Sequence, residues 1–397
     1  MSDNPQSVEV DVTLFGGGVT GLWLLNLLHK KGYSALLLES GAIGDGQTRY
    51  SQGIIHGGTK YALAGKLTDS SEVIAEMPLF WRSCLRGEGE LDLRSVKLLS
   101  EFQYLWSTAS ITSRMAGFFA SKMMRSRTAV LDESERPGLF QGKGFKGQVY
   151  RLDEPVLEIA SLLAALSGRV QENILHYDIA GMEIEPGRID LVANGKRLTI
   201  NTLAIVLTAG KGNESLLKAM GRTTPAMQIR PLQMVMARGG LPSNIYAHCL
   251  GASVNPRITI SSHLDTAGET VWYLGGQLAE EGVTRSAEEQ IRAAKKELGS
   301  LFPWLDISKT AFAALPIDRA EIRQADGSRP ADAWAEMERG VITAWPTKLA
   351  FAPRLANHII ELLEQNQVQG SGGTIDEIDW PLAKIASLPW QEEERWK

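Results

Sequence analysis

Cysteine is scarce in this chain of 397 residues, which contains only Cys84 and Cys249, far apart in the sequence. Two isolated cysteines exclude a disulfide framework and a cysteine-rich metal site. We therefore expect both to be buried thiols of a protein in a reducing compartment. The six histidines form no local metal motif either. The sequence predicts no metal site.

Long apolar runs and an excess of positive charge are also missing. No stretch of about 18 apolar residues is present, which argues against a membrane-spanning helix. The polar, acidic start MSDNPQSVEVDV is unlike a signal peptide. The formal net charge of -5 argues against a general nucleic-acid binder. Together these absences favour a cytoplasmic protein.

The C-terminal tail, residues 371–397, contains Trp380, Trp390 and Trp396. Two interpretations of these tryptophans are open. They could touch a membrane interface, where indole rings are enriched, and would then attach the protein peripherally to a membrane. Alternatively, the tail packs on the protein's own surface.

What the sequence does contain is a glycine-rich turn between a short apolar strand and an apolar helix. Residues 9–15 predict a buried strand, GGGVTG follows, and an apolar helix then continues to a stop at Gly32. Residues 34–40 predict a second strand that carries Glu39 at its end. The order strand, glycine turn, helix, strand is typical of a nucleotide-binding unit.

Gly16, Gly18 and Gly21 have the spacing of a dinucleotide-binding turn. The first glycine permits a tight turn, the second lets a pyrophosphate approach the main chain, and the third lets the helix pack on the strand. The pyrophosphate would bind the free N–H groups of the helix N-terminus. Glu39 is placed to accept hydrogen bonds from a ribose, which favours FAD or NAD over NADP. The alternative is a glycine-rich turn in some other α/β protein.

The segment after Glu39 bears on the choice of dinucleotide. Residues 40–66 are rich in glycine and show little periodicity, whereas a nicotinamide dehydrogenase usually continues with alternating strands and helices. Loops this long inside compact domains are usually functional or disordered. The apolar and aromatic content of this one argues against disorder, so we expect it to run along an extended cofactor.

These motifs resemble those of a known flavoenzyme family. GGGVTG, LLLES and SQGIIHGGTKY are similar to segments of the D-amino acid oxidase superfamily of FAD-dependent oxidoreductases. The closest similarity is to the glycerol-3-phosphate dehydrogenase branch, with L-2-hydroxyglutarate dehydrogenase-like enzymes nearby. Residues 202–213 resemble the second nucleotide strand, and residues 340–365 resemble the C-terminal flavin segment. In that segment Thr347 and Ala350 replace the usual Gly and Thr.

The resemblance implies an α/β FAD-binding domain, Rossmann-like and of the GR2 type, and a second α+β substrate domain built on an antiparallel sheet. The FAD-binding domain would be discontinuous, comprising residues 1–85, 150–222 and 331–370. Residues 86–149 and 223–330 would form the substrate or cap domain. The cap is expected to hold strands in residues 232–239, 257–265 and 270–278 and a helix over residues 284–305. The composition of residues 98–129 favours a helix.

Contacts with FAD are implied for residues of all three pieces. Ile179 would lie near the adenine or would belong to the core. Lys348, at a helix start, would stabilise the negative charge of reduced flavin or would be a solvated lysine. Gly53, Gly57 and Gly58 would let the isoalloxazine ring lie against the main chain. The full predicted set is Gly16, Gly18, Val19, Thr20, Gly21, Glu39, Ser40, Thr48, Ser51, Gln52, Gly53, Ile179, Ala209, Gly210, Thr347, Lys348 and Leu349.

His56, Lys60 and Tyr61 are candidates for the chemistry itself. An imidazole titrates near neutral pH, so His56 could act as a base, or it could only order the glycine-rich loop. Lys60 and Tyr61 match a basic and aromatic pair of the family and could hold a phosphate or carboxylate. Their alternative roles are a surface lysine and a packed tyrosine.

Arg319 lies where the family usually has an anion-binding arginine. A guanidinium can hold a carboxylate or phosphate with two parallel hydrogen bonds. The chain has Ile-Asp-Arg-Ala where the family has Gly-x-Arg-Pro, so Asp318 could instead neutralise Arg319 in a structural ion pair. Arg257 and His263 are weaker candidates for the same pocket.

The sequence thus predicts an FAD-dependent oxidoreductase, a dehydrogenase or oxidase. It would remove a hydride from a CH–OH or CH–NH carbon of a small anionic substrate, such as glycerol 3-phosphate or a 2-hydroxy acid. The alternatives are an amino-acid or amine oxidase on the same scaffold and a non-catalytic FAD-binding redox subunit. The electron acceptor could be oxygen, a quinone or a carrier protein, and the sequence does not choose among them.

Overall fold

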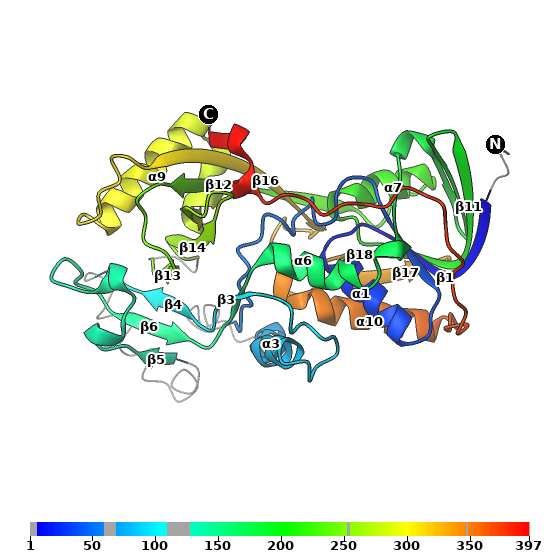
Figure 1. The fold of residues 1–397 in the computed structure, drawn as a ribbon, viewed down its shortest axis with the longest axis horizontal. Helices are drawn as coiled ribbons and strands as arrows, with labels where there is room; N and C mark the ends of the chain where they lie inside the picture. The colour runs from blue at the N-terminus through cyan, green and yellow to red at the C-terminus, as the bar shows by residue number, and fades with distance from the viewer. Residues whose placement is uncertain (1–5, 59–68, 109–127, 252–254, 347, 397) are drawn as a thin grey trace.

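The computed structural model describes residues 6–58, 69–108, 128–251, 255–346 and 348–396. Two sheets organise these residues into two lobes (Figure 1). One lobe contains β1, β11, α1 and α10, and the other contains β4, β6, β14 and α9. The long strands β12 and β16 extend between the two lobes (Figure 1).

The first sheet is built around parallel strands. β1 (Gln6–Phe15) lies between β11 (Lys196–Leu207) and β2 (Ala35–Glu39), and both neighbours run parallel to it. The order along the sheet is β17-β18-β11-β1-β2-β8, with β10 and β9 added beside β11 by antiparallel pairing. The other strands are β8 (Ile174–His176), β9 (Met182–Glu185), β10 (Arg188–Ala193), β17 (Trp334–Glu338) and β18 (Val341–Trp345).

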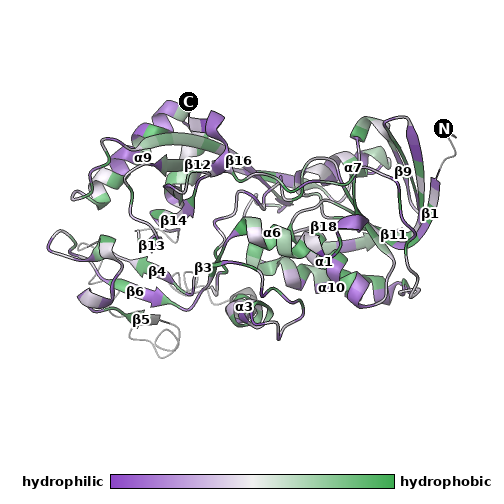
Figure 2. Ribbon diagram, in the orientation of Figure 1, coloured by the Kyte–Doolittle hydropathy of each residue, from purple (hydrophilic) through white to green (hydrophobic). Residues whose placement is uncertain are grey.

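Helices cover the first sheet and explain its apolar sequence. α1 (Val19–Lys30) contacts α10 (Ala352–Gln365) and α6 (Ile159–Gly168) as well as the sheet, so nearly every residue of its first two turns is buried. α10 carries both hydrophobic and hydrophilic residues (Figure 2), and its buried residues recur at the three- and four-residue spacing of one helix face. α3 (Asp69–Leu85) and α7 (Asn213–Ala219) complete this lobe.

The second sheet is mostly antiparallel. Its order is β16-β12-β15-β14-β13-β4-β6-β5, and β4 and β13 pair in parallel. α9 (Ala287–Leu301) packs on β12 and β16 and begins at Ser286, whose hydroxyl accepts a hydrogen bond from Glu289 N (3.2 Å). The strands are β4 (Gln103–Trp106), β5 (Thr128–Val130), β6 (Val149–Leu152), β12 (Met227–Arg238), β13 (Tyr246–Cys249), β14 (Ile258–Leu264), β15 (Thr270–Gly275) and β16 (Ala311–Ile322).

Short elements join these layers. β3 (Leu98–Ser100) pairs with β7 (Val156–Leu157), and α8 (Gln277–Glu281) follows β15. Single 3-10 turns lie at Glu133–Glu135, Gly138–Phe140, Gln171–Asn173, Ile179–Gly181, Gly210–Gly212, Gly282–Thr284, Leu349–Phe351, Pro389–Gln391 and Glu393–Trp396.

Most sequence-based predictions of elements are confirmed, but one is wrong. Residues 98–100 and 103–106 are strands rather than a helix, and residues 109–127 lie outside the described residues. The Rossmann-like sheet and the second, antiparallel-based sheet are confirmed. The division into a FAD-binding and a substrate domain stays a prediction. Cys84 and Cys249 are buried free thiols.

The C-terminal tail runs back across the molecule, from the first lobe to the second (Figure 1). It forms bridges between Leu382 and Leu175 and between Ile385 and Ile43. Trp380 and Trp390 are both buried, and the Trp390 ring stacks on His263 at 3.8 Å. These two tryptophans therefore pack on the protein itself.

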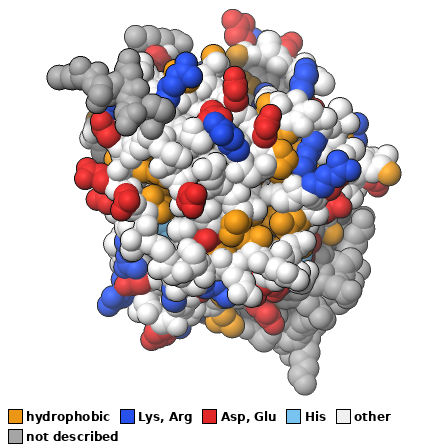
Figure 3. Space-filling view, turned by 90° about the vertical axis from the view of Figure 1, so that its right-hand side faces the viewer, with side chains coloured by type: hydrophobic (Ala, Val, Ile, Leu, Met, Phe, Trp, Pro, Cys, Tyr) orange, Lys and Arg blue, Asp and Glu red, His pale blue; other side chains and the backbone are white. Residues whose placement is uncertain are grey.

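Two surface properties complete the fold. Among the described residues, no helix combines the length and the apolar character needed to cross a bilayer. On the face shown in Figure 3, Lys and Arg side chains are interspersed with Asp and Glu, and hydrophobic groups are scattered between them.

Candidate active site

A hollow opens where β1 ends and α1 begins. Gly16 there has φ +102°, and a Cβ on it would lie 2.5 Å from Ala209 Cα. A Cβ on Gly21 would lie 2.1 Å from Gly16 O, so α1 packs directly on the turn. Gly18 is different, because among the described residues its Cβ would meet only Thr48 Oγ1, at 3.4 Å, and Gly18 lines the hollow. The first and third glycines thus serve packing, and Gly18 leaves room for a ligand.

The N-terminus of α1 has an unsatisfied hydroxyl. Thr20 lines the hollow and is 3% exposed, yet its Oγ1 has no hydrogen-bond partner among the described residues. A buried polar group without a partner costs free energy, so such groups usually mark an absent ligand, water or ion. The first N–H groups of a helix also have no partner within the helix. A pyrophosphate would satisfy both features at once.

Glu39 and Ile179 line the same hollow farther along. The Glu39 carboxylate accepts hydrogen bonds from Gly17 N (2.6 Å) and Gly41 N (2.8 Å), and burial raises its pKa. A carboxylate has further lone pairs, which leaves acceptor capacity for ribose hydroxyls. Ile179 is 61% exposed, so its interpretation as a core residue is wrong.

A second hollow adjoins the first, and the two share part of their lining. The residues that line both hollows come from α1, the glycine-rich segment, β16 and the end of β18, namely Val19, Gln47, Thr48, Tyr50, Ile317 and Pro346. The predicted residues Ser51, Gln52, Lys348 and Leu349 line the second hollow, while Ser40, Ala209 and Gly210 line the first. One extended ligand can therefore reach from Glu39 to Lys348.

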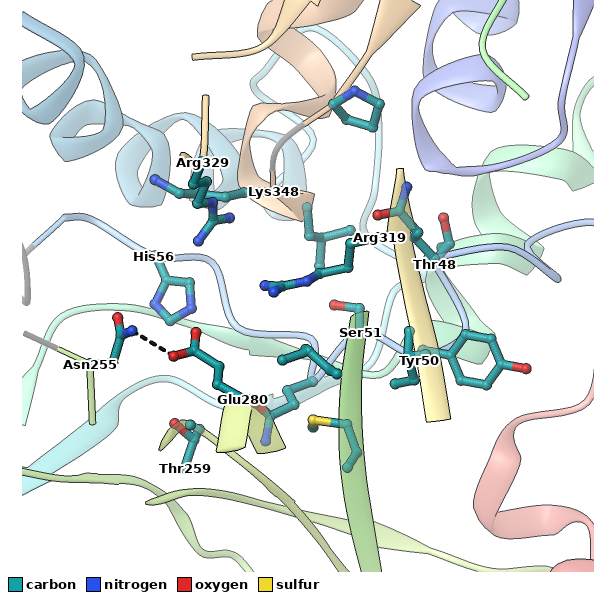
Figure 4. Close-up of a pocket in the computed structure, with 18 of the residues that line it drawn as sticks. Thr48, Tyr50, Ser51, His56, Asn255, Thr259, Glu280, Arg319, Arg329 and Lys348 are labelled. Atoms are coloured by element: carbon teal, nitrogen blue, oxygen red, sulfur yellow. Dashed lines mark hydrogen bonds between the residues drawn. The ribbon is translucent and has the colours of Figure 1, made fainter. Parts of the chain in front are cut away.

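Basic side chains converge on the second hollow, which we call the substrate pocket. Arg319, Arg329 and Lys348 all line it, and the Arg319 guanidinium points into it (Figure 4). Arg319 belongs to β16, and its Nε donates to Arg230 O (3.1 Å) on β12. Among the described residues it forms no ion pair. Burial, with help from the charges of Arg230 and Arg329, lowers its pKa to about 10.

The alternative that Asp318 neutralises Arg319 is wrong. Neighbouring residues of a strand point to opposite faces, and Asp318 pairs instead with Lys211. Arg319 therefore keeps a guanidinium directed at the pocket, which is the arrangement required to bind an anion.

His56 lies on the wall of the substrate pocket beside a buried carboxylate. Its Nδ1 is 3.5 Å from Glu154 Oε2, and Glu154 is 3% exposed and also accepts a hydrogen bond from Gln103. The His56 ring stacks on the ring of His248 at 5.5 Å, and His248 Nδ1 contacts Thr259 Oγ1 (2.8 Å). Glu154 fixes the orientation of the imidazole, which suits either a base or an ordering role.

Gly53 and Gly57, near His56, pack closely within the protein, and their predicted contact with the flavin ring stays a prediction. A Cβ on Gly53 would lie 2.0 Å from Leu157 O. A Cβ on Gly57 would lie 3.0 Å from Pro78 and 3.2 Å from Glu154. Packing within the protein therefore accounts for Gly53 and leaves little room beside Gly57, and neither glycine lines the two hollows.

The remaining candidate residues either lie away from the substrate pocket or fall outside the described residues. Arg257 pairs with Glu297 of α9, and His263 is buried against Trp390, so neither lines the substrate pocket. Lys60, Tyr61 and Thr347 lie outside the described residues. Sequence reasoning missed Asn255, Glu280 and Arg329, which line the pocket from a loop, a short helix and a second loop. No local motif marks any of the three.

Both hollows fit FAD. Gly18 leaves space, Thr20 offers an unsatisfied hydroxyl, Glu39 keeps acceptor capacity, and Lys348 lies at the far end near the start of the 3-10 turn Leu349–Phe351. A Rossmann-like sheet, a two-part ligand hollow and a cationic pocket define a flavin-dependent oxidoreductase.

Comparison with known proteins agrees. Residues 11–336 match the family model described as FAD dependent oxidoreductase, DAO. The chain is 44% identical over 373 residues to the probable FAD-dependent oxidoreductase PA4991 of Pseudomonas aeruginosa, a match that covers 92% of this chain and 94% of the relative. The crystal structure of PA4991 superposes with a TM-score of 0.83 at 38% identity, covering 98% of this chain and 99% of the other.

More distant structures share the fold. Glycine oxidase from Geobacillus kaustophilus has a TM-score of 0.65 at 16% identity, covering 90% and 95% of the two chains. Glycerol-3-phosphate dehydrogenase from Bacillus halodurans, complexed with FAD, has a TM-score of 0.57 at 14% identity, covering 90% and 65%. The chain belongs to the DAO family of FAD-dependent oxidoreductases. The predicted family, enzyme class and cofactor are confirmed.

Proposed function

We propose that the protein oxidises a small anionic substrate at a CH–OH or CH–NH carbon. The observation that carries this proposal is Arg319, a mostly buried guanidinium that points into the substrate pocket and has no carboxylate partner among the described residues. A buried charge is costly unless it is paired. An anionic group of the substrate would supply the missing partner through two parallel hydrogen bonds.

FAD, when bound, accepts the hydride that leaves the substrate carbon. The residues of the chain have the remaining tasks. Arg319 binds the anionic group and thereby orients the reacting carbon in the pocket. His56, held by Glu154, accepts the proton of the substrate OH or NH. Lys348 places a positive charge near the end of the hollow that would receive the flavin ring.

The alternative of a non-catalytic FAD-binding subunit predicts a blocked pocket without converging cations. Here the pocket is open, and Arg319, Arg329 and Lys348 line it. Relatives of similar fold are named for glycine and for glycerol 3-phosphate, so the residues of this pocket must decide the substrate of this chain.

The test is anaerobic reduction of the purified, flavin-loaded protein by a panel of small acids, phosphate esters and amines. Bleaching of the oxidised-flavin absorbance by at least one anionic member, and weaker response to uncharged analogues, is the expected result. If uncharged alcohols or amines bleach the flavin as readily as their anionic analogues, the proposed role of Arg319 is wrong. Subsequent exposure to oxygen or to a quinone would then identify the class of electron acceptor.

A further inference from the structure

The substrate pocket also contains a carboxylate that the oxidation of an anion does not require. Glu280 lines the pocket, and its side chain extends into it (Figure 4). Its Oε2 accepts a hydrogen bond from Asn255 Nδ2 (2.7 Å). Within the described parts of the chain, Glu280 forms no ion pair. A negative group in a site for anions would weaken binding unless it has a function of its own.

The local backbone aims this carboxylate at the pocket. α8 begins after Gly276, which has φ +79° and whose Cβ would lie 2.6 Å from Pro256 O. Gln277 N donates to Pro256 O (2.8 Å), so the start of α8 is fixed to the loop that carries Asn255. The next residue, Glu281, does not line the pocket and accepts a hydrogen bond from Arg285 (3.2 Å). Two consecutive glutamates thus face different surroundings.

Glu280 and Arg319 are complementary without being paired. Both line one pocket, from different elements, and no ion pair joins them. If Glu280 served only to neutralise the basic side chains of the pocket, direct contact with one of them would be expected, since close contact is what offsets the cost of desolvating two charges. Instead, Glu280 bonds to Asn255 and Arg319 bonds to Arg230 O, while both side chains line the pocket.

We propose that Glu280, together with Asn255, binds a cationic amine of the substrate while Arg319 binds its anionic group. The substrate class is therefore zwitterionic, a small acid or phosphate ester that carries an amine, in preference to hydroxy acids and glycerol 3-phosphate. Glu280 is a specificity-determining residue in this scheme, and Asn255 positions its carboxylate. This inference rests on the proposed function, because it takes the anion site at Arg319 as given.

The test compares amine and hydroxyl members of matched pairs. The probes are glycine with glycolate, alanine with lactate, β-alanine with 3-hydroxypropionate, and 2-aminoethyl phosphate with 2-hydroxyethyl phosphate, with both enantiomers where they exist. Each is titrated anaerobically into the flavin-loaded protein, and the midpoint of the change in flavin absorbance is recorded. We expect the amine member of at least one pair to act at a concentration about 10-fold or more below its partner, the usual worth of a hydrogen bond to a charged group.

Glu280→Gln keeps the size of the side chain and an acceptor for Asn255 but removes the charge. We expect it to abolish the preference for amines. Glu281→Gln, on the same helix but outside the pocket, is the matched control and should leave the preference unchanged. Flavin content and circular dichroism establish that both variants are folded. If Glu280→Gln loses flavin, the preference of the unaltered protein decides the proposal alone.

Two results would overturn the inference while leaving the proposed function intact. In the first, hydroxyl members act at equal or lower concentrations than their amine partners in every pair. In the second, Glu280→Gln binds flavin and retains the preference. A third result, no response to any anion of either kind, would instead overturn the anion site at Arg319 and with it the proposed function.

Discussion

Replacement of Arg319 by methionine should stabilise the fold while it removes anion binding. Arg319 is mostly buried, and its pKa of about 10 lies below the ordinary value of 12.5 because burial disfavours its charged form. One pKa unit corresponds to about 1.36 kcal/mol, so the penalty is about 3 kcal/mol. Loss of the hydrogen bond to Arg230 O (3.1 Å) costs about 1 kcal/mol. The expected net gain is about 1–2 kcal/mol.

The sign and the pH window follow from the same pKa. A cation whose pKa is depressed in the folded state destabilises that state while it is charged. The penalty is therefore complete below about pH 10 and disappears as the pH rises toward the unfolded value. At pH 7 the full gain from Arg319→Met should be visible, and it should not depend on pH between 6 and 8.

The assay is urea unfolding at pH 7 with the same excess of FAD for every variant, because bound ligand raises apparent stability. Arg230→Met, directly opposite on β12, is the control. Arg230 lies 3.3 Å from Glu321, which is 1% exposed, so its loss leaves a buried carboxylate unpaired at a cost of about 3–5 kcal/mol. Added acetate or phosphate should stabilise the unaltered protein and not Arg319→Met. If Arg319→Met loses as much stability as Arg230→Met, Arg319 is a structural residue and the reasoning fails.

Three further predictions address the cofactor, the tail and the base. Gly18→Ala should fold, because its Cβ would meet only Thr48 Oγ1 among the described residues, but should bind FAD at least about 10-fold more weakly in a flavin fluorescence titration; wild-type affinity would contradict the assigned role. Burial lowers the pKa of His263 to about 3. As the pH falls, the unfolded chain is therefore protonated at His263 before the folded protein is. The free energy of unfolding should consequently fall by about 2 kcal/mol between pH 7.5 and pH 5. His263→Phe should show a smaller loss by urea unfolding, and an equal loss would refute this. Glu154→Gln removes the charge 3.5 Å from His56, so the acid limb of the pH–rate profile should move to lower pH by about one unit with flavin retained; an unchanged limb would exclude His56 as the base.

The nucleotide half of the site could be predicted because its signals are local. Gly16, Gly18 and Gly21 lie within one turn of chain, and Glu39 ends the next strand. Each residue has a role set by its immediate neighbours, and the structure places all of them around one hollow or its supporting turn. Spacing alone is enough to recognise such a unit.

Errors arose where distant segments decide the structure. Residues 103–106 have a composition that suits a helix, yet they form β4 because β13, which starts at Tyr246, pairs with them. Long-range pairing of this kind overrides local propensity. Similarly, Gly57 packs closely against Pro78 and Glu154, and nothing in its own segment indicates those neighbours.

The substrate pocket was the least predictable region for the same reason, and Glu280 shows why. It stands beside Glu281 in the sequence QLAEE, and successive residues of a helix point about 100° apart. One carboxylate therefore enters the pocket, and the other bonds to Arg285 on the far side. The start of α8, which Gly276 fixes against Pro256, determines which of the two glutamates points into the pocket. Arg319 and Glu280 thus share a property that no local pattern contains: each lines the same pocket, and neither has an ion-pair partner among the described residues. A charge that is held in a pocket without an ion-pair partner lowers the stability of the fold. A ligand that carries one positive and one negative group would pair with Glu280 and Arg319 together and remove that cost at both.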